Sequence, residues 1–251
     1  MSAIDFSGRT ALVTGGTRGI GEAIADGLRA GGARVIATGT NQAEVEGRNR
    51  DLTRRGEDTG CFRLLDFTNA ESVRRFLDGL SDDGRIDICI NNAGTNRIQP
   101  VEDVSPADYE FLMKVNLEGP FLVSQRVCEL MRPFRYGRIV NIASIWSVVT
   151  RAHRSVYTTT KSGLVGLTRC LAVEMAPHNI LVNCVSPGFT VTELTRASLT
   201  EAQQQELAGR IPMGRLARPE EISRVVLFLA SQLNTYLTGQ NIVVDGGFAS
   251  V

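Results

Sequence analysis

Short apolar stretches rich in β-branched residues alternate along the chain with longer stretches in which apolar residues recur at helical spacing. The short stretches predict strands at residues 10–14, 33–38, 61–65, 86–90, 138–142, 180–186 and 241–244. The longer ones predict helices at residues 19–30, 41–55, 69–80, 106–131, 155–176 and 219–231. Buried strands that alternate with crossover helices are typical of a parallel sheet covered on both faces. We therefore predict one doubly wound α/β domain over residues 1–251.

The stretch from about residue 189 to 215 departs from this alternation. It follows the turn Ser186-Pro187-Gly188, is polar from Gln203 to Gln205, and ends at Pro212-Met213-Gly214. In doubly wound folds ligands bind at the carboxyl ends of the strands, and long excursions in compact domains usually serve function. We predict a lid over a substrate here, with a surface helix and loop as the alternative.

Amino-acid composition excludes several classes of protein. The 251 residues carry 27 Lys and Arg against 27 Asp and Glu, and this zero balance argues against a nucleic-acid or anionic-membrane partner. No apolar run approaches the roughly 18–20 residues of a membrane span, and the N-terminus does not have the regions of a signal peptide. The five cysteines include no CxxC pair, so neither a disulfide framework nor a zinc site is indicated. These features predict a soluble cytoplasmic protein without a metal.

A glycine-rich loop, Thr14-Gly15-Gly16-Thr17-Arg18-Gly19-Ile20-Gly21, lies between the first predicted strand and the first predicted helix. Its glycines allow a tight turn and let a pyrophosphate approach the backbone, where amides at the helix start face the negative charge. The spacing is GxxxGxG, and its place at the first strand–helix junction makes it a strong sign of a dinucleotide site. The residues predicted to bind the cofactor here are Gly15, Thr17, Arg18, Gly19, Ile20 and Gly21.

The end of the second predicted strand indicates which dinucleotide binds. An acidic residue about 20 positions after the glycine loop normally holds the adenosine ribose of NAD. Here the strand ends in Thr38-Gly39-Thr40-Asn41-Gln42, and no acid appears before Glu44. Without that carboxylate nothing repels a 2′-phosphate, which Arg18, Thr40 and Asn41 can bind. We therefore predict NADP(H) as the preferred cofactor, with NAD(H) as the alternative.

The end of the third predicted strand carries Asp66 and Phe67. A carboxylate at this position is suited to the edge of the adenine ring, so both residues are included in the predicted cofactor site. A helix N-cap is the other interpretation of Asp66.

Tyr157 and Lys161 are four residues apart in one predicted helix, so their side chains share a face. A phenol with a pKa near 10 is a poor base at neutral pH, and a neighbouring ammonium favours its ionised form. Ser144 follows the fifth predicted strand, where a hydroxyl can bind a reacting oxygen. A YxxxK pair alone is common, but this one lies thirteen residues after that serine in a dinucleotide-binding pattern. We predict these three residues as catalytic.

These motifs make the chain similar to the short-chain dehydrogenase/reductase family over essentially its whole length. The residues that carry the resemblance are Thr14–Gly21, Asn91-Asn92-Ala93-Gly94, Asn116, Ser144, Tyr157, Lys161, Pro187-Gly188 and Asp245-Gly246-Gly247. The family implies a Rossmann-like fold and hydride transfer between a nicotinamide and a carbonyl or alcohol substrate. It also implies a homo-oligomer, commonly a tetramer, with the helices near 106–131 and 155–176 and the tail Phe248-Ala249-Ser250-Val251 as candidate interfaces.

The resemblance also implies roles for individual residues. Tyr157 is expected to act as general acid in reduction and general base in oxidation, while Lys161 lowers its pKa and binds the nicotinamide ribose. Ser144 is expected to position the substrate oxygen, and the Asn116 backbone carbonyl to hold a water that links Lys161 to solvent. The cofactor is expected to contact residues after the fourth and sixth strands, namely Asn91, Asn92, Ala93, Gly94, Pro187, Gly188 and Thr190. A turn stabilised by asparagine side chains is the alternative for the first four.

Basic side chains near the expected mouth of the site suggest the charge of the substrate. Arg97 follows the asparagine-rich turn, and Arg151, His153 and Arg154 lie just before the predicted catalytic tyrosine. Guanidinium groups bind carboxylate or phosphate bidentately, so an anionic substrate is predicted, with a solvated rim or a subunit contact as the alternative. Trp146 is expected to form an apolar wall near the substrate or to fill the core.

Two subfamilies fit these features. The ending Thr38-Gly39-Thr40 is similar to 3-oxoacyl-[acyl carrier protein] reductases, in which Arg135 would match a carrier-docking arginine and His178 would replace its partner. Asn179-Ile180, with the arginines near the mouth, resembles gluconate-type sugar-acid dehydrogenases. Reduction of 3-oxoacyl substrates is the preferred prediction, and oxidation of an anionic sugar acid or polyol is the alternative. A non-catalytic NADP(H)-binding regulatory protein is a more remote one, which the complete catalytic set opposes.

Overall fold

The computed structural model describes residues 4–56, 59–193, 195 and 200–250. Within these residues the chain forms one sheet of seven strands: β1 (Thr10–Val13), β2 (Arg34–Gly39), β3 (Gly60–Leu64), β4 (Ile88–Asn91), β5 (Gly137–Ile142), β6 (Ile180–Pro187) and β7 (Asn241–Val244). Every neighbouring pair is parallel, in the order β3-β2-β1-β4-β5-β6-β7. The predicted doubly wound fold is confirmed.

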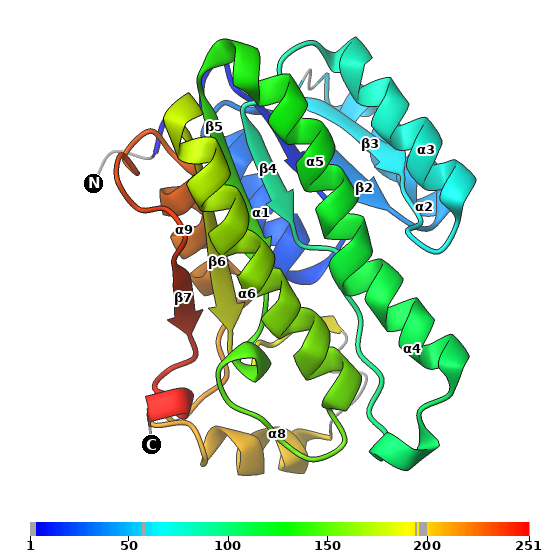
Figure 1. Cartoon of the computed structure of the whole chain (residues 1–251), viewed down its shortest axis with the longest axis vertical. Coiled ribbons are helices and arrows are strands. Elements are labelled where there is room, and N and C mark those ends of the chain that lie inside the picture. The colour runs from blue at the N-terminus through cyan, green and yellow to red at the C-terminus, as the bar shows by residue number, and fades with distance from the viewer. Residues whose placement is uncertain (1–3, 57–58, 194, 196–199, 251) are drawn as a thin grey trace.

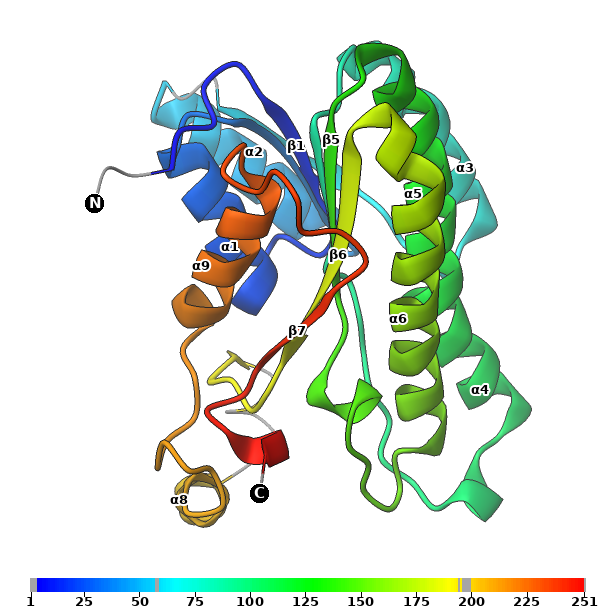
Figure 2. The same cartoon turned by 60° about the vertical axis from the view of Figure 1, so that its left-hand side comes forward.

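Helices cover both faces of the sheet. They are α1 (Gly19–Ala30), α2 (Gln42–Arg54), α3 (Ala70–Gly79), α4 (Pro106–Met113), α5 (Gly119–Met131), α6 (Ser155–Met175), α8 (Glu201–Ala208) and α9 (Pro219–Ala230). Figure 2 shows α1, α2 and α9 on one face and α3, α5 and α6 on the other. Alternation along β1 feeds both cores, because Ala11 and Val13 pack with α1 and α9 while Leu12 packs with α5. In the described part of the chain, no helix has the length and hydropathy needed to cross a membrane.

The strand order creates a crevice beside β1. The chain runs from β1 outward to β2 and β3, and then returns to β4 on the other side of β1. The loops that follow β1 and β4 therefore leave the sheet in opposite directions and open a space between them, which is where doubly wound folds bind ligands. The glycine-rich loop follows β1 and the asparagine-rich turn begins at the end of β4, so the two motifs meet at this crevice.

The helix predicted over residues 106–131 is interrupted by a π-helical turn at Lys114–Glu118. It separates α4 from α5, and it contains Asn116, whose side chain is completely buried. Such turns insert an extra residue into a helix and are frequent at functional sites. The interruption therefore sets the position of one of the predicted catalytic residues.

The predicted lid lies at the carboxyl end of the sheet, where Figure 1 shows α8 below β6 and β7. Residues 194 and 196–199 of this segment lie outside the described residues. The rest is tied to the domain at both ends, since the Val191 amide donates to the Ala217 carbonyl at 2.8 Å and the Met213 amide to the Gly246 carbonyl at 3.2 Å. It therefore lies at the carboxyl ends of the strands, and its role as a lid stays a prediction.

Candidate active site

The glycine-rich loop has the backbone geometry that phosphate binding needs. Gly15 and Gly19 have φ angles of 63° and 57°, a left-handed conformation that L side chains rarely adopt. Arg18 is the N-cap residue of α1 and makes no capping hydrogen bond through its side chain. The first amides of α1 consequently receive no side-chain partner from this residue, and they present the positive end of the helix to an anion.

Thr14 and Asn92 join the glycine-rich loop to the end of β4. The Thr14 hydroxyl accepts hydrogen bonds from the Asn92 and Ala93 amides, each at 3.0 Å. The Asn92 side-chain amide donates to the Thr14 and Gly15 carbonyls at 3.0 and 2.9 Å. Asn92, predicted as a cofactor residue, thus uses its side chain to hold the two walls of the crevice together.

Gly21 is the tightest point of this arrangement. A Cβ atom there would overlap the Gly15 carbonyl oxygen and the Asn92 side-chain amide. We expect Gly21→Ala to displace the glycine-rich loop, weaken NADPH binding at least tenfold and lower the free energy of unfolding by about 2 kcal/mol. Gly47→Ala is the matched control, because Gly47 also lies within a helix but its Cβ would meet only the Arg50 guanidinium, at 3.8 Å.

Fluorescence titration with NADPH and thermal unfolding separate these two variants. Alanine is the better helix former by about 0.5–1 kcal/mol, so Gly47→Ala should unfold at the same or a higher temperature than the wild type. Unchanged NADPH affinity in Gly21→Ala would show that the loop tolerates the displacement and would contradict the packing argument.

The end of β2 exposes the groups predicted to bind a 2′-phosphate. Thr40, Asn41 and Arg18 are all exposed. The Asn41 side-chain oxygen accepts from the Glu44 amide at 3.0 Å and caps α2, which leaves the NH2 group of that side chain as a donor at a helix N-terminus. Arg48, which no sequence pattern singled out, donates to the Thr17 carbonyl in the glycine-rich loop at 2.5 Å. Arg48 also pairs with Glu22, so it supports the loop, and the donors that remain for a phosphate are those of Arg18, Thr40 and Asn41.

Asp66 and Phe67 have different environments. The Asp66 Oδ1 atom accepts from the Thr68 amide and hydroxyl at 2.8 and 2.7 Å, an Asx turn that leaves Oδ2 without a hydrogen bond among the described residues. The alternative that Asp66 caps a helix is wrong, because Asn69 caps α3 by accepting from the Ser72 amide at 3.0 Å. The Phe67 ring is buried, so a contact between Phe67 and a cofactor would involve its backbone.

Tyr157 and Lys161 lie one turn apart on α6, with the lysine Nζ atom 5.7 Å from the centre of the tyrosine ring. Lys161 is only 3% exposed, and its ammonium donates to the Ile142 carbonyl at the end of β5 at 2.8 Å. Burial disfavours the charged form and lowers the pKa of Lys161 to about 8. The lysine is a buried cation directed toward the expected nicotinamide side of the site.

Ser144 lies within hydrogen-bonding reach of the Tyr157 phenol. Burial raises the pKa of Tyr157, whereas a hydrogen bond with the Ser144 hydroxyl and the charge of Arg154 lower it. The Ser144 hydroxyl also accepts from the Trp146 amide at 3.3 Å, which begins a single helical turn after β5. The structure thus brings together the serine, the tyrosine and the lysine that the sequence singled out.

Asn116 connects these residues to the turn after β4. Its side chain forms two hydrogen bonds of 2.9 Å with the Thr95 backbone, one to the amide and one to the carbonyl, and a third of 3.3 Å to Thr160. A Cβ atom on Gly94 would lie 3.2 Å from Lys161 Nζ and 3.4 Å from the Asn116 side-chain oxygen. Glycine at position 94 therefore lets Lys161 and Asn116 approach the backbone of this turn closely.

A small hydrogen-bond network holds the backbone of Ser144 in place, and sequence reasoning missed its members. The Ser147 hydroxyl donates to the Ser144 carbonyl at 2.8 Å and lies 3.1 Å from the Ser186 hydroxyl. Ser186 in turn donates to the Asn241 side chain of β7 at 2.7 Å. These residues come from three distant segments, so no motif or spacing could have connected them.

The segment after β6 borders the crevice on its remaining side. The Gly188 amide donates to the Val244 carbonyl at 2.8 Å, and a Cβ atom on Gly188 would lie 2.7 Å from Asp245 Cα, which explains the glycine after Pro187. The Thr190 hydroxyl donates to the Gly188 carbonyl at 3.2 Å. Thr192, which was not predicted, lies beside Gly19 of the glycine-rich loop. This segment therefore reaches across to α1.

The four basic residues near the mouth differ in their partners. Arg97 forms an ion pair with Asp108 and stacks on Phe111, so its charge is neutralised within the chain. Arg151 and His153 are exposed. Arg154 is half-buried and contacts the Trp146 ring. Only part of the predicted basic cluster is thus available to a substrate.

Trp146 itself is buried, at 7% exposure, and belongs to an aromatic cluster. Its ring centre lies 6.0 Å from that of Phe189 and 6.4 Å from that of Phe248, both in edge-on contacts. Trp146 therefore fills the local core and borders Arg154, and its role as a wall near the substrate stays a prediction. The described part of the tail beyond β7 packs through Phe248 against this wall, and Val251 lies outside the described residues.

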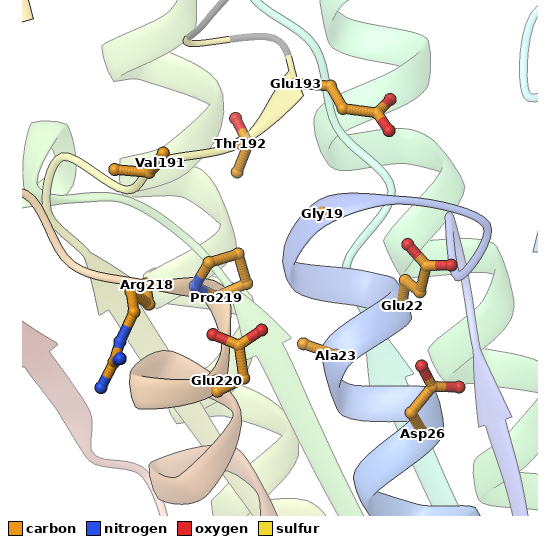
Figure 3. Close-up of a pocket in the computed structure, with 10 residues that line it drawn as sticks. All are labelled: Gly19, Glu22, Ala23, Asp26, Val191, Thr192, Glu193, Arg218, Pro219 and Glu220. Carbon is orange, nitrogen blue, oxygen red and sulfur yellow. The ribbon is translucent and has the colours of Figure 1, made fainter.

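An open cleft of about 450 Å³ lies on the outer side of the glycine-rich loop, between the N-termini of α1 and α9 and the segment after β6 (Figure 3). Its acidic lining residues are Glu22, Asp26, Glu193 and Glu220. Arg218 also lines it, and Glu22 is paired with Arg48. None of the predicted catalytic residues lines the cleft. Gly19, a predicted cofactor residue, does line it, so the cleft adjoins the predicted phosphate-binding loop.

Comparison with known proteins agrees with this arrangement. Residues 15–249 match the family model described as enoyl-(acyl carrier protein) reductase. The chain is 42% identical over 246 residues to the 3-oxoacyl-[acyl-carrier-protein] reductase FabG of Aquifex aeolicus, which covers 97% of this chain and 98% of that protein. The fold and the relatives together define a nicotinamide-dependent oxidoreductase.

Solved structures extend the comparison. The gluconate 5-dehydrogenase of Burkholderia cenocepacia, in complex with NADP and tartrate, is 34% identical with a TM-score of 0.91, over 99% of this chain and 98% of that one. A short-chain type dehydrogenase/reductase of Mycobacterium marinum is also 34% identical, with a TM-score of 0.88, over 98% of this chain and 97% of that one. This chain belongs to the short-chain dehydrogenase/reductase family.

Proposed function

We propose that this enzyme reduces 3-oxoacyl thioesters with NADPH. The observation that carries the proposal is the meeting of Ser144, Tyr157 and Lys161 at the carboxyl end of the sheet, beside a glycine-rich crevice. The substrate class is supported by the 3-oxoacyl-[acyl-carrier-protein] reductase of Aquifex aeolicus, whose likeness to this chain spans nearly the full length of both proteins.

The described residues fit NADP(H). The glycine-rich loop and the start of α1 suit the pyrophosphate, and the exposed Arg18, Thr40 and Asn41 suit a 2′-phosphate. The Lys161 ammonium, which lies close to Gly94, suits the hydroxyl groups of the nicotinamide ribose. The cofactor supplies the hydride in reduction and accepts it in oxidation. NADP in the Burkholderia cenocepacia structure supports the same choice here.

The side chains of the enzyme hold the carbonyl and move the proton. The Ser144 hydroxyl donates a hydrogen bond to the carbonyl oxygen, and the Tyr157 phenol gives its proton to that oxygen as it gains negative charge. In the reverse direction the tyrosine takes the proton back. Lys161 stabilises the ionised phenol through its charge, and Asn116 keeps the turn after β4 in place beside it.

Cofactor preference and turnover test this function together. With a short 3-oxoacyl thioester, we expect kcat/KM for NADPH to exceed that for NADH at least tenfold. Arg18→Ala should raise KM for NADPH about tenfold and change KM for NADH little, because only the first cofactor carries the 2′-phosphate. A protein that binds NADPH but does not reduce the thioester would refute the acyl-reductase assignment.

A second candidate is the oxidation of a sugar acid with NADP+. It is favoured by Arg154, whose charge has no acidic partner among the described residues, and by the likeness to gluconate 5-dehydrogenase. Oxidation of D-gluconate compared with D-glucitol tests it, because the two differ only in the carboxylate. Equal rates for both compounds would count against recognition of the acid.

The partners of the chain are also proposals. Arg135 precedes β5 and donates to the Pro177 carbonyl at 3.0 Å, whereas Ser144 follows the other end of that strand. This separation within one chain favours a small thioester over a carrier protein docked at Arg135. We also propose a homo-oligomer, because the exposed Phe121 of α5 and Val173 of α6 leave apolar surface on the predicted interface helices.

A further inference from the structure

Arg154 is a half-buried cation that forms no ion pair with an Asp or Glu among the described residues, although the Tyr157 phenol favours its charged form. Its guanidinium carbon lies 5.6 Å from the centre of the Trp146 ring, and no acidic side chain of these residues forms an ion pair with it. Burial disfavours the charged form, so the pKa of Arg154 is lowered. Arg97, by contrast, is neutralised by Asp108. A cation drawn out of water without a partner suits an anion that arrives with a ligand.

The position of Arg154 relates this cation to the chemistry. It is the N-cap residue of α6 and lies three residues before Tyr157, so both face the same side of the helix start. Burial raises the pKa of the Tyr157 phenol, and the charge of Arg154 is close enough to offset part of that rise. Trp146, on which it stacks, lies two residues after Ser144. An anion bound by Arg154 would therefore lie beside the reacting carbonyl.

The surroundings add positive potential. Arg151 is close enough to lower the pKa of Arg154 by repulsion. The first turn of α6 contains no acidic residue, and no side chain caps its N-terminus. The positive end of this 21-residue helix therefore adds to the positive potential at Arg154. His153 has a φ angle of 66°, a left-handed conformation that reverses the chain just before Arg154. Positive charge from Arg151 and from the start of α6 therefore gathers around Arg154.

We propose that Arg154, assisted by Arg151, binds a carboxylate that the substrate carries close to its reacting carbonyl or hydroxyl group. Trp146 supports the flat guanidinium, whose paired N–H groups match the two oxygens of a carboxylate. This inference rests on the proposed oxidoreductase function and extends its substrates from neutral 3-oxoacyl groups to small oxo and hydroxy acids.

The charge preference of turnover tests the proposal. Acetoacetate and methyl acetoacetate carry the same ketone and differ by one carboxylate charge, and NADPH oxidation gives the ratio of kcat/KM for the acid over the ester. We expect Arg154→Gln to lower this ratio about tenfold or more, because a hydrogen bond between charged groups contributes about that factor. Arg154→Lys should lower it less. An effect that acts through Tyr157 changes kcat/KM for both substrates by the same factor and cancels in the ratio.

Arg169→Gln is the matched control, since Arg169 is an exposed arginine of the same helix, and it should keep the wild-type ratio. An equal ratio in the wild type and Arg154→Gln overturns the proposal. Calorimetric titration of acetoacetate into the protein–NADP+ complex measures binding without turnover. If Arg154→Gln weakens binding tenfold, the anion site is supported even where neither ketone is reduced. The absence of reduction would then refute only the proposed function. No binding of acetoacetate to the wild type contradicts the site.

Discussion

Tyr157→Phe is expected to lower kcat/KM for a 3-oxoacyl thioester by roughly a thousandfold while NADPH still binds within about threefold of the wild-type affinity. The substitution removes only the hydroxyl group, and general acid catalysis contributes roughly 10² to 10⁴ to such reactions. Tyr157 is half-buried on α6 beside Ser144, so phenylalanine fits the same space. A loss of turnover with retained binding is the result that distinguishes an enzyme from an NADP(H)-binding regulatory protein.

The chain offers a convenient reporter for this experiment. Trp146 is its only tryptophan and lies close to the proposed substrate, so its fluorescence can follow NADPH binding in both proteins. Tyr109→Phe on α4 serves as the control, because Tyr109 is 48% exposed and is none of the predicted site residues. Turnover that survives in Tyr157→Phe would remove the tyrosine from the mechanism and require another proton donor.

Predicting the fold succeeded because the sequence carries its signal locally. Each strand is a short apolar run and each helix shows its own period, so the strand positions were off by only one or two residues at most ends. The glycine-rich loop, Ser144 and the pair on α6 could likewise be found from spacing, because each motif is contiguous. Their meeting at one edge then follows from parallel strands, whose carboxyl ends lie together.

What spacing could not supply is which side chains neutralise one another. Arg97 and Arg154 look alike in the sequence, yet an acidic residue of α4 pairs with the first and no described acidic residue pairs with the second. Aspartate is typical of an N-cap, yet Asn69 rather than Asp66 caps α3. The π-helical turn around Asn116 also escaped prediction, because apolar periodicity continues through it. These features depend on contacts between segments, and a single sequence does not encode such contacts in a readable pattern.

Lys161→Met is expected to abolish most activity and yet to stabilise the cofactor-free protein. The pKa of this buried lysine is about 8, against 10.5 for a solvated lysine, so below pH 8 the folded protein holds a charge that burial disfavours. A difference of that size corresponds to about 3 kcal/mol of lost stability near pH 7. Methionine has a similar shape and no charge, and it forfeits about 1 kcal/mol for the hydrogen bond to the Ile142 carbonyl.

The sign of the pH dependence is fixed by which state binds the proton more tightly. The folded pKa lies below the unfolded one, so the unfolded chain binds more protons between pH 8 and 10.5, and the stability of the wild type rises with pH across this window. The advantage of Lys161→Met, about 2 kcal/mol or roughly 4–8 °C in Tm at pH 7, should therefore shrink as the pH rises through 8 toward 10.5.

Lys114→Met provides the control, because Lys114 is the other lysine of the chain and is exposed. It should change Tm little at any pH, and only Tm is compared, because Lys114 begins the π-helical turn that contains Asn116. Turnover by Lys161→Met should fall at least a hundredfold, since the phenol of Tyr157 loses the cation that favours its ionised form. A Met variant that is less stable at pH 7, or whose advantage does not vary with pH, would show that the buried charge is not destabilising. We expect less activity together with more stability, because a buried cation that serves catalysis lowers the free energy of unfolding.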